Sequence, residues 1–374
     1  MNSIMLVDER ERLLLAPYAM RSADSAGRVY PEPLHAYRGP FQRDRDRILH
    51  SSAFRRLSGK MQVFTGEMGD YHRTRLTHTH EVASIARTIG RALRLNEDLI
   101  EALALMHDIG HPPYGHAGED ALNESARDFG GFSHNRFGLT IVQEIEFRFT
   151  QFPGLNLTRD VLDGQTARID KRGDRPRPLL EVQLVDAADS VTYDAHDTDD
   201  AIKLGLVSLE QMKRLGLISE CLQFVENNYT GLSEELLRQA VVHRLIERQV
   251  TSLLEYCASR LQEFDFDSVE EAIQSPFLVE PDDELREMKQ ELEAFLYQHV
   301  YRHPHLVQIR NRAQDKLKEM FRAFCRNPDL FPPKYRRRAA KVGVERMAVE
   351  YNAGMTDHFC EQVYQQLTEA GGGQ

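Results

Sequence analysis

Cysteine is scarce in this sequence. The four cysteines are far apart and form no Cys-x-x-Cys pair, which argues against a structural zinc knuckle and against a disulfide framework. No run of ~20 apolar residues is present, so we expect no segment to cross a membrane. The first residues, MNSIMLVDERERLLL, place acidic side chains directly after a very short apolar patch, unlike a signal peptide. These absences together predict a cytoplasmic protein.

Positive charge is also in short supply. The 47 lysines and arginines are outnumbered by 58 aspartates and glutamates, which gives a net charge of −11. This balance argues against a dominant non-specific affinity for nucleic acid or for an anionic membrane, although a local basic pocket remains compatible with it. The 374 residues, 41% of them hydrophobic, suffice for one large domain or two ordinary ones.

Alternating hydrophobic patterns are too weak to propose a main β-sheet, whereas helical periodicity is widespread, so the predicted fold class is all-α. Turn-forming residues mark residues 1–42 as an N-terminal arm. Apolar residues recur at helical spacing over 81–93, Asn96 is expected to cap a helix that runs to about 106, and a further helix is expected over roughly 180–203. Long amphipathic helices are expected between 208 and 325. The segment 168–180 is rich in Gly, Pro and charge and predicts an exposed loop.

Histidines are concentrated in one part of the chain, where residues 107–116 alone read HDIGHPPYGH. Helical spacing places His78 four residues before Val82, and His107 four residues after Leu103. Each of these two histidines therefore shares the apolar stripe of its helix. Asp108 directly follows His107.

A carboxylate joins these histidines from a third helix. Asp189 lies four residues after Val185 and begins a polar stripe with Tyr193 and Asp197. Buried imidazoles and carboxylates without partners are costly, and one shared cation would satisfy His78, His107, Asp108 and Asp189 together. Such a ligand set suits Mn, Fe, Co, Ni or Zn, and Mg less comfortably. The alternative is that each histidine is satisfied separately by a backbone carbonyl.

The order H…HD…D resembles the HD-domain metal phosphohydrolases. Five blocks extend the resemblance to the bacterial dGTPase-like deoxynucleoside triphosphate triphosphohydrolases, over about residues 12 to 360. In chain order the blocks are RRLSGKMQVF (55–64), RTRLTHTHEVASIAR (73–87), HDIGHPPYGHAGEDALN (107–123), DAADSVTYDAHDTDDA (186–201) and EYNAGMTDHF (350–359). Met61 and Tyr114 depart from the residues usual in this family, without removing a functional group. The resemblance implies an HD-domain helical bundle over 43–210, with additional helices over 211–374.

The implied reaction splits a dNTP into deoxynucleoside and inorganic triphosphate by attack of water on the α-phosphorus. The sugar oxygen is a poor leaving group, so the reaction should need a general acid. The resemblance assigns this role to His116, with Glu119 one turn later to orient it and favour its protonated form. As an alternative, His116 could simply cap the following helix. The implied metal site holds one divalent ion on His78, His107, Asp108 and Asp189. This ion would be Mn, Mg, or another metal such as Fe, Co, Ni or Zn.

The resemblance also implies a substrate pocket. Arg75 would contact phosphate, and His111 and His134 would contact phosphate or water. Tyr193 would close the space beside a 2′-OH; the alternative is an ordinary core aromatic residue with its hydroxyl satisfied. The remaining implied pocket residues are Gln62 and Val63, beside the sugar and base, and Asp197, as acceptor of the 3′-OH.

Members of this family assemble as tetramers or hexamers, so a homo-oligomer is expected, and a dNTP effector could bind between its subunits. The run KYRRR (334–338) would suit a regulatory nucleotide or single-stranded DNA, but a solvated helix face explains it better. Two other functions stay open at this point. One is an HD phosphohydrolase that acts on another nucleotide, and the other is a dNTP-sensing or nucleic-acid-binding protein without turnover.

Overall fold

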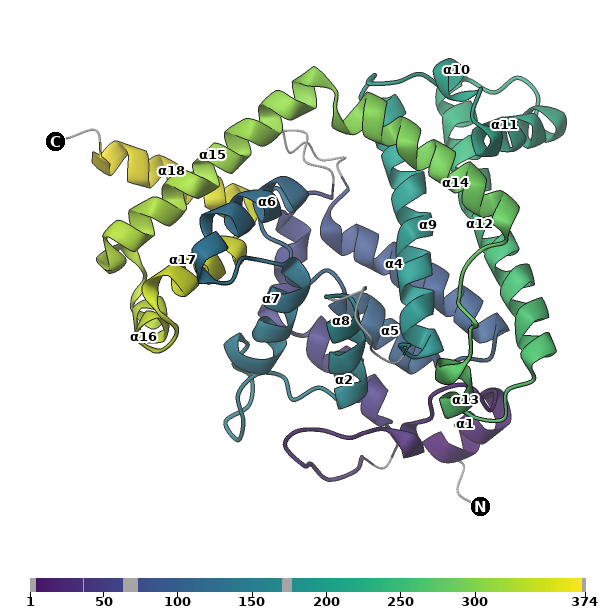
Figure 1. Ribbon diagram of the computed structural model, residues 1–374, viewed down its shortest axis with the longest axis horizontal. Coiled ribbons are helices and arrows are strands. Elements are labelled where there is room, and N and C mark those ends of the chain that lie inside the picture. Colours follow the sequence, from purple (N-terminus) through teal and green to yellow (C-terminus); the bar gives the residue numbers. More distant parts are fainter. Residues whose placement is uncertain (1–4, 36, 63–72, 170–176, 372–374) are drawn as a thin grey trace.

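The computed structural model describes residues 5–35, 37–62, 73–169 and 177–371, with only the backbone of residues 370 and 371. Eighteen α-helices make up most of these ranges, which contain no β-strand beyond three isolated bridges (Figure 1). The all-α prediction is therefore confirmed. The short 3₁₀ turns are Ser22–Asp24, Leu57–Gly59, Arg127–Phe129 and Pro328–Leu330.

Three helices form the centre of the molecule: α4 (Arg75–Ala92), α5 (Glu97–Met106) and α9 (Leu180–Lys203). They pack on one another through apolar residues at helical spacing, and α2 (Pro40–Leu49) covers the other side of α5. The side chain of Asn96 accepts hydrogen bonds from the backbone N–H groups of Asp98 and Leu99, as expected of a helix cap. The predicted helix over 180–203 is also confirmed.

The N-terminal arm contains α1 (Val7–Leu14), which the sequence pattern did not predict. Behind this helix, Ala16 and Ala19 are buried, so this part of the arm packs on the body of the protein. The short α3 (Ser52–Arg56) follows α2. After α5 the chain continues through α6 (Gly115–Ser125), α7 (His134–Thr140), one turn of π-helix (Ile141–Ile145) and α8 (Arg159–Ala167).

The C-terminal part is dominated by the long helices α12 (Glu234–Phe264), α14 (Asp283–Leu296) and α15 (Pro304–Arg326). One turn of π-helix, Tyr297–Tyr301, links α14 to α15. Figure 1 shows α15 extending across the molecule, and it packs on α6. The other helices of this part are α10 (Leu209–Met212), α11 (Gly216–Asn228), α13 (Val269–Gln274), α16 (Pro333–Val342), α17 (Val344–Ala353) and α18 (Asp357–Gly371).

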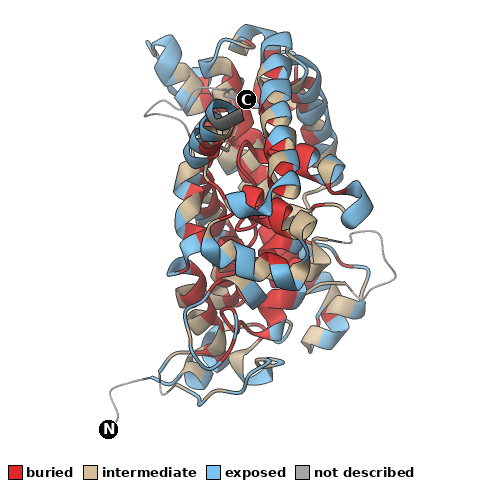
Figure 2. Ribbon diagram, turned by 90° about the vertical axis from the view of Figure 1, so that its left-hand side faces the viewer, coloured by how far each residue is buried: buried red, intermediate tan, exposed pale blue. Residues whose placement is uncertain are grey.

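Buried side chains form two apolar clusters, and exposed residues lie on the outer faces of the helices (Figure 2). The larger cluster joins the central helices to residues of α15, α17 and α18. The smaller cluster joins the end of α9 to α11, α12 and α14. The division of the chain at residues 42 and 210 stays a prediction, and the clusters do not follow it, because α9 contributes to both. In the described ranges, every helix is too short or too polar to span a bilayer.

Candidate active site

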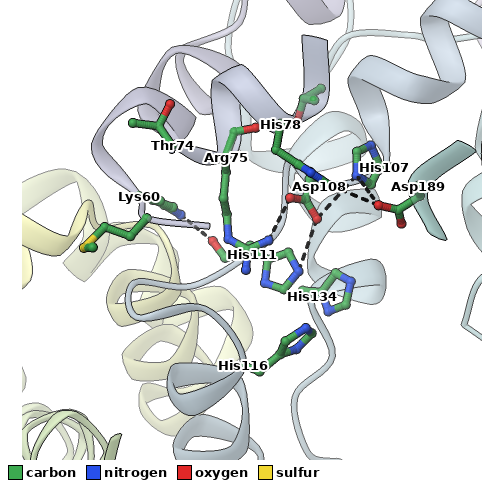
Figure 3. A network of polar contacts seen from close by, with 12 residues as sticks. Lys60, Thr74, Arg75, His78, His107, Asp108, His111, His116, His134 and Asp189 are labelled. Atoms are coloured by element: carbon green, nitrogen blue, oxygen red, sulfur yellow. Dashed lines mark hydrogen bonds and ion pairs between the residues drawn. The ribbon is translucent and has the colours of Figure 1, made fainter. Parts of the chain in front are cut away.

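The four predicted metal ligands lie together where α4, α5 and α9 meet (Figure 3). His78 extends from α4, His107 and Asp108 directly follow α5, and Asp189 extends from α9. The Oδ1 atom of Asp189 lies 3.0 Å from Nε2 of His78 and 3.7 Å from Nε2 of His107. Oδ1 of Asp108 also lies 3.7 Å from Nε2 of His107. Three helices distant in sequence thus direct nitrogen and oxygen ligands to one point.

The residues present fit a divalent cation. Nδ1 of His107 lies 2.6 Å from the carbonyl oxygen of Ala104, so this nitrogen carries the ring proton and Nε2 holds a lone pair. That buried Nε2 atom has no hydrogen-bond partner among the described residues. A buried lone pair that faces two carboxylates is the arrangement expected of a metal ligand. Ligand atoms of His78, His107 and Asp108 all lie within 4.8 Å of one another.

Two arginines balance the negative charge of the two candidate ligand carboxylates, Asp108 and Asp189. Nη1 of Arg75 lies 2.7 Å from Asp108, and Nη2 of Arg168 lies 2.9 Å from Asp189. Burial alone would raise the pKa of Asp108, but the Arg75 guanidinium and a hydrogen bond with His111 hold this pKa well below its usual range. Burial also opposes the charge of Asp189, whose pKa is nevertheless held low by a hydrogen bond with His78 and by the Arg168 guanidinium. Both carboxylates are therefore ionised at neutral pH.

Arg168 corrects the predicted exposed loop at 168–180. Its side chain is only 12% exposed and also pairs with Asp186 at 2.7 Å. The sequence gave no signal for this contact, because Arg168 directly follows α8 and precedes a segment rich in Gly, Pro and charge. Residues 170–176 of the predicted loop lie outside the described residues.

Four more predicted residues form a second cluster beside the first. The rings of His111 and His134 stack with their centroids 3.8 Å apart. Nδ1 of His134 lies 2.8 Å from Oε1 of Glu119, whereas Nδ1 of His116 lies 3.4 Å from Oε2 of the same residue. The expected orienting contact between Glu119 and His116 is therefore present, but His134 is the closer partner of Glu119.

The surroundings of His111 and Glu119 determine whether each of these two side chains is charged. Burial and the nearby Arg75 guanidinium lower the pKa of His111 far enough to keep this ring neutral. Burial alone would raise the pKa of Glu119, but hydrogen bonds with His116 and His134 outweigh it and keep the carboxylate ionised. His116 itself has a side chain that is 63% exposed.

The backbone before His116 has an unusual conformation. Tyr114 has φ = +65° and Gly115 has φ = +58°, two successive residues in the left-handed region. A Cβ atom on Gly115 would lie 2.9 Å from Nη2 of Arg75. Glycine is therefore favoured at this position both by its backbone angle and by the close passage of the arginine. His116 is the second residue of α6 and leaves this tight turn toward a cavity.

This cavity has a volume of about 260 Å³. Its walls include five of the predicted residues, namely Gln62, Arg75, His116, Tyr193 and Asp197. Val63, which was predicted beside Gln62, lies outside the described residues. Sequence reasoning missed four further lining residues, which come from the π-helical turn and α15: Tyr297, Tyr301, Leu306 and Arg310.

The cavity is closed on one side by a pair of tyrosines. The rings of Tyr193 and Tyr301 are nearly parallel, at an interplanar angle of 15°, and the Tyr301 hydroxyl donates a hydrogen bond to that of Tyr193. Asp197 lies one turn beyond Tyr193 and is 2% exposed. Burial and the nearby Asp200 raise the pKa of Asp197 well above its usual value, although Tyr193 and Arg73 oppose this shift. A hydrogen-bonding group of a ligand would offset the cost of burying this carboxylate.

A further histidine supports the ligand His78. Nδ1 of the buried His196 lies 3.4 Å from Nδ1 of His78, and Nε2 of His196 contacts the carboxylate of Glu81. Because a carboxylate accepts hydrogen bonds, neutral His196 carries its proton on Nε2 and accepts through Nδ1. His78 can then carry its own proton on Nδ1, so that a cation could replace the hydrogen bond between its Nε2 and Oδ1 of Asp189.

Comparisons with known proteins identify two domains in this chain and several similar proteins. Residues 75–194 match the HD domain, and residues 279–366 match the phosphohydrolase-associated domain. Three relatives carry the name deoxyguanosinetriphosphate triphosphohydrolase-like protein. The relative from Nitrosomonas europaea is 38% identical over 94% of this chain and 97% of its own length. Those from Ralstonia pickettii and Bordetella pertussis are both 39% identical, over 94% and 96% of this chain and 94% and 97% of their own lengths.

Proposed function

The chain belongs to the family of deoxyguanosinetriphosphate triphosphohydrolase-like proteins with an HD domain, and from this premise we propose that it hydrolyses deoxynucleoside triphosphates to deoxynucleoside and inorganic triphosphate. One observation carries the proposal. The ligand cluster, with the unpaired Nε2 of His107, lies next to a cavity whose wall holds His116. A site for a cation and a group able to deliver a proton are thus adjacent.

Positive charge in the cavity suits a triphosphate. Arg75 binds Asp108 through Nη1 and is also one of the residues that line the cavity. Arg310 reaches the cavity from α15, and its only ion-pair partner among the described residues is Asp120, at 3.6 Å. We assign both arginines to the phosphates, with His111 and His134 as neighbouring phosphate or water contacts. Electrostatic clamping of this kind is the main contribution of a protein to phosphoryl transfer.

Each of these residues is then assigned one part in the hydrolysis step. An oxygen–phosphorus bond forms between water and the α-phosphorus, the bond from the α-phosphorus to the 5′ oxygen breaks, and the proton lost by the attacking water passes to solvent. His116 donates a proton to this leaving oxygen, which departs as the hydroxyl of the deoxynucleoside. Glu119 holds His116 and His134 in place. A divalent cation would be held by His78, His107, Asp108 and Asp189. This cation, Mn, Mg, Fe, Co, Ni or Zn, would supply Lewis-acid activation of water and phosphate.

The sugar is proposed to lie against Tyr193 and Asp197. The Asp197 carboxylate would accept a hydrogen bond from the 3′-OH, which would satisfy its buried oxygens. The Tyr193 ring, held by Tyr301, would occupy the space that a 2′-OH needs. Ribonucleotides would therefore be excluded by a steric clash. Gln62 would frame the sugar and base. Assembly as a tetramer or hexamer, with a dNTP effector between subunits, stays a prediction.

A product assay tests this function. The purified protein is incubated with each dNTP and each rNTP, singly and mixed, with Mn or Mg, and the products are separated by anion exchange. Deoxynucleoside plus triphosphate is the expected result. Monophosphate plus pyrophosphate would contradict the role of His116, and hydrolysis of a different nucleotide would favour another HD phosphohydrolase. Binding of dNTP without any product, in metal-loaded protein, would favour a sensor.

A further inference from the structure

One sequence block has no role in the site as described so far: EYNAGMTDHF at residues 350–359. Its Asp357 is the first residue of α18 and is 5% exposed. Oδ2 of Asp357 accepts a hydrogen bond from the backbone N–H of Met61 at 2.9 Å. Oδ1 accepts one from the backbone N–H of Tyr114 at 3.0 Å. One carboxylate thus binds the backbone of two segments that line the cavity, from positions far apart in the sequence.

A buried lysine joins the same three segments. Lys60 precedes Met61 and is 2% exposed. Its ammonium group donates to the carbonyl oxygen of His111 and, at 3.1 Å, to that of Ala353. Figure 3 shows Lys60 beside His111, with the C-terminal ribbon (yellow) close behind. The segment before Gln62, the loop after α5 and the turn between α17 and α18 are therefore tied at one place.

The tie to Tyr114 falls on the strained part of the backbone. Tyr114 has φ = +65°, which a bulky side chain rarely adopts, so surrounding contacts must hold it there. The N–H group of this residue is the donor to Asp357. Gly115 and His116 follow directly, and the direction in which α6 leaves this turn determines where the His116 ring lies.

We propose that Asp357 is a positioning residue: its carboxylate holds the left-handed turn at Tyr114 and thereby aims His116 into the cavity. Both of its oxygens bind backbone of the cavity walls, and neither binds a side chain of α18. The same two hydrogen bonds that attach α18 to the body of the protein therefore also restrain both cavity segments. The catalytic consequence rests on the proposed function, whereas the effect on the turn does not.

The variant Asp357→Asn tests the proposal with little change in size. Its amide offers one acceptor oxygen and places an NH₂ group against the second N–H donor, so one hydrogen bond is replaced by a repulsive contact. We expect kcat to fall at least about tenfold, while KM for dNTP changes less than about threefold. Metal content should stay that of the wild type, because Asp357 touches none of the four proposed ligands.

A double-mutant cycle separates aiming of His116 from general destabilisation. If Asp357 acts through His116, then Asp357→Asn should change the residual rate of the His116→Ala protein by less than about threefold. Full additivity of the two losses would overturn the proposal, as would a wild-type kcat in Asp357→Asn. If Asp357→Asn does not fold, Asp357→Glu takes its place in the cycle. This variant keeps both acceptor oxygens, one methylene further out, and the same non-additive loss of kcat is expected.

A readout without turnover keeps the two proposals separable. Amide hydrogen exchange over residues 107–118 should increase in Asp357→Asn more than elsewhere, and an unchanged exchange pattern would overturn the positioning role. If the wild type shows no dNTP hydrolysis, the proposed function fails while this readout still decides on Asp357. The control is Glu361→Gln on the same helix, which loses an ion pair with Lys316 (2.6 Å) and should leave both kcat and exchange over 107–118 unchanged.

Discussion

His116 differs from the other histidines of the site in its exposure. The side chains of His78, His107 and His111 are at most 3% exposed, and that of His134 is 17% exposed, against 63% for His116. The buried rings are fixed by carboxylates, by a backbone carbonyl or by stacking. The exposed ring can exchange protons with solvent between turnovers, which a general acid requires.

We predict that His116→Ala keeps metal and nucleotide binding but loses turnover by about 10²- to 10⁴-fold, the usual contribution of a general acid. The ion pairs Arg75–Asp108 and Arg168–Asp189 do not involve His116, so the proposed ligands should stay in place. The measurements are single-turnover rates, metal content, and binding of a non-hydrolysable dNTP analogue. Near-normal turnover in this variant would show that another group protonates the leaving oxygen.

Asp189→Ala is predicted to lose the metal. The substitution removes the oxygen that lies 3.0 Å from His78, and it leaves the Arg168 guanidinium without a ligand carboxylate to balance. Metal affinity should fall by more than about a hundredfold, beyond what loss of a supporting contact produces. Metal content after dialysis checks this. Asp186→Asn is the matched control, because it removes the other partner of Arg168 and should retain the metal.

At the scale of elements, the site depends on how closely α4 and the start of α6 approach each other. Arg75 begins α4 and passes Gly115, the first residue of α6, on its way to Asp108. On the other side, α15 packs on α6 and places Arg310 at the cavity. The helix that bears His116 is therefore fixed between one helix of the HD domain and one of the C-terminal part.

Gly115→Ala should disturb this approach. The new Cβ would meet Nη2 of Arg75 at 2.9 Å and would adopt φ = +58°. We expect a loss of about 1–2 kcal/mol in the free energy of unfolding from the backbone angle. KM for dNTP should also increase, because Arg75 is displaced.

The matched control is Gly205→Ala. Gly205 has φ = +68° but no atom within 4 Å of an added Cβ, so only the backbone cost should appear. Denaturant unfolding and steady-state kinetics distinguish the two variants. An unchanged KM in Gly115→Ala, with the same loss of stability as the control, would contradict the role of Arg75 at the phosphates.

At the scale of the whole molecule, the N-terminal arm is joined to the centre by a buried carboxylate. Oε1 of Glu181, near the start of α9, accepts hydrogen bonds from the backbone N–H groups of Met20 (2.9 Å) and Asn96 (3.2 Å). Burial raises the pKa of Glu181 from 4.5 to about 7, although these hydrogen bonds oppose the shift. No described basic side chain pairs with it, so its charge is costly at neutral pH.

This shift predicts how stability depends on pH. The folded pKa exceeds the unfolded one, so the folded state binds more protons between pH 4.5 and about 7. The stability from Glu181 is fully present below pH 4.5 and is lost as pH rises through about 7, a change of about 3 kcal/mol. Glu181→Gln should therefore be more stable than the wild type at pH 8 and not at pH 4.5. Denaturant unfolding at both values checks this, and an equal difference at both would contradict it.

The sequence by itself determined what depends on neighbours along the chain. The cap at Asn96 follows from the side chain of asparagine just before an apolar pattern, and the helix over 180–203 and the inward direction of His78 and His107 follow from spacing of three and four residues. Helix α1 in the arm was missed because its eight residues are too few for a clear period.

Only the tertiary structure decided which side chains meet across helices. Tyr301 contacts Tyr193, although 108 residues separate them in the sequence. Arg168, which was predicted to lie in an exposed loop, pairs with Asp189. Asp357 likewise joins two distant segments, and Glu119 turned out to lie closer to His134 than to His116. Periodicity reports which face of a helix is buried, but the neighbour on that face is selected by packing of the whole core, which no local spacing records.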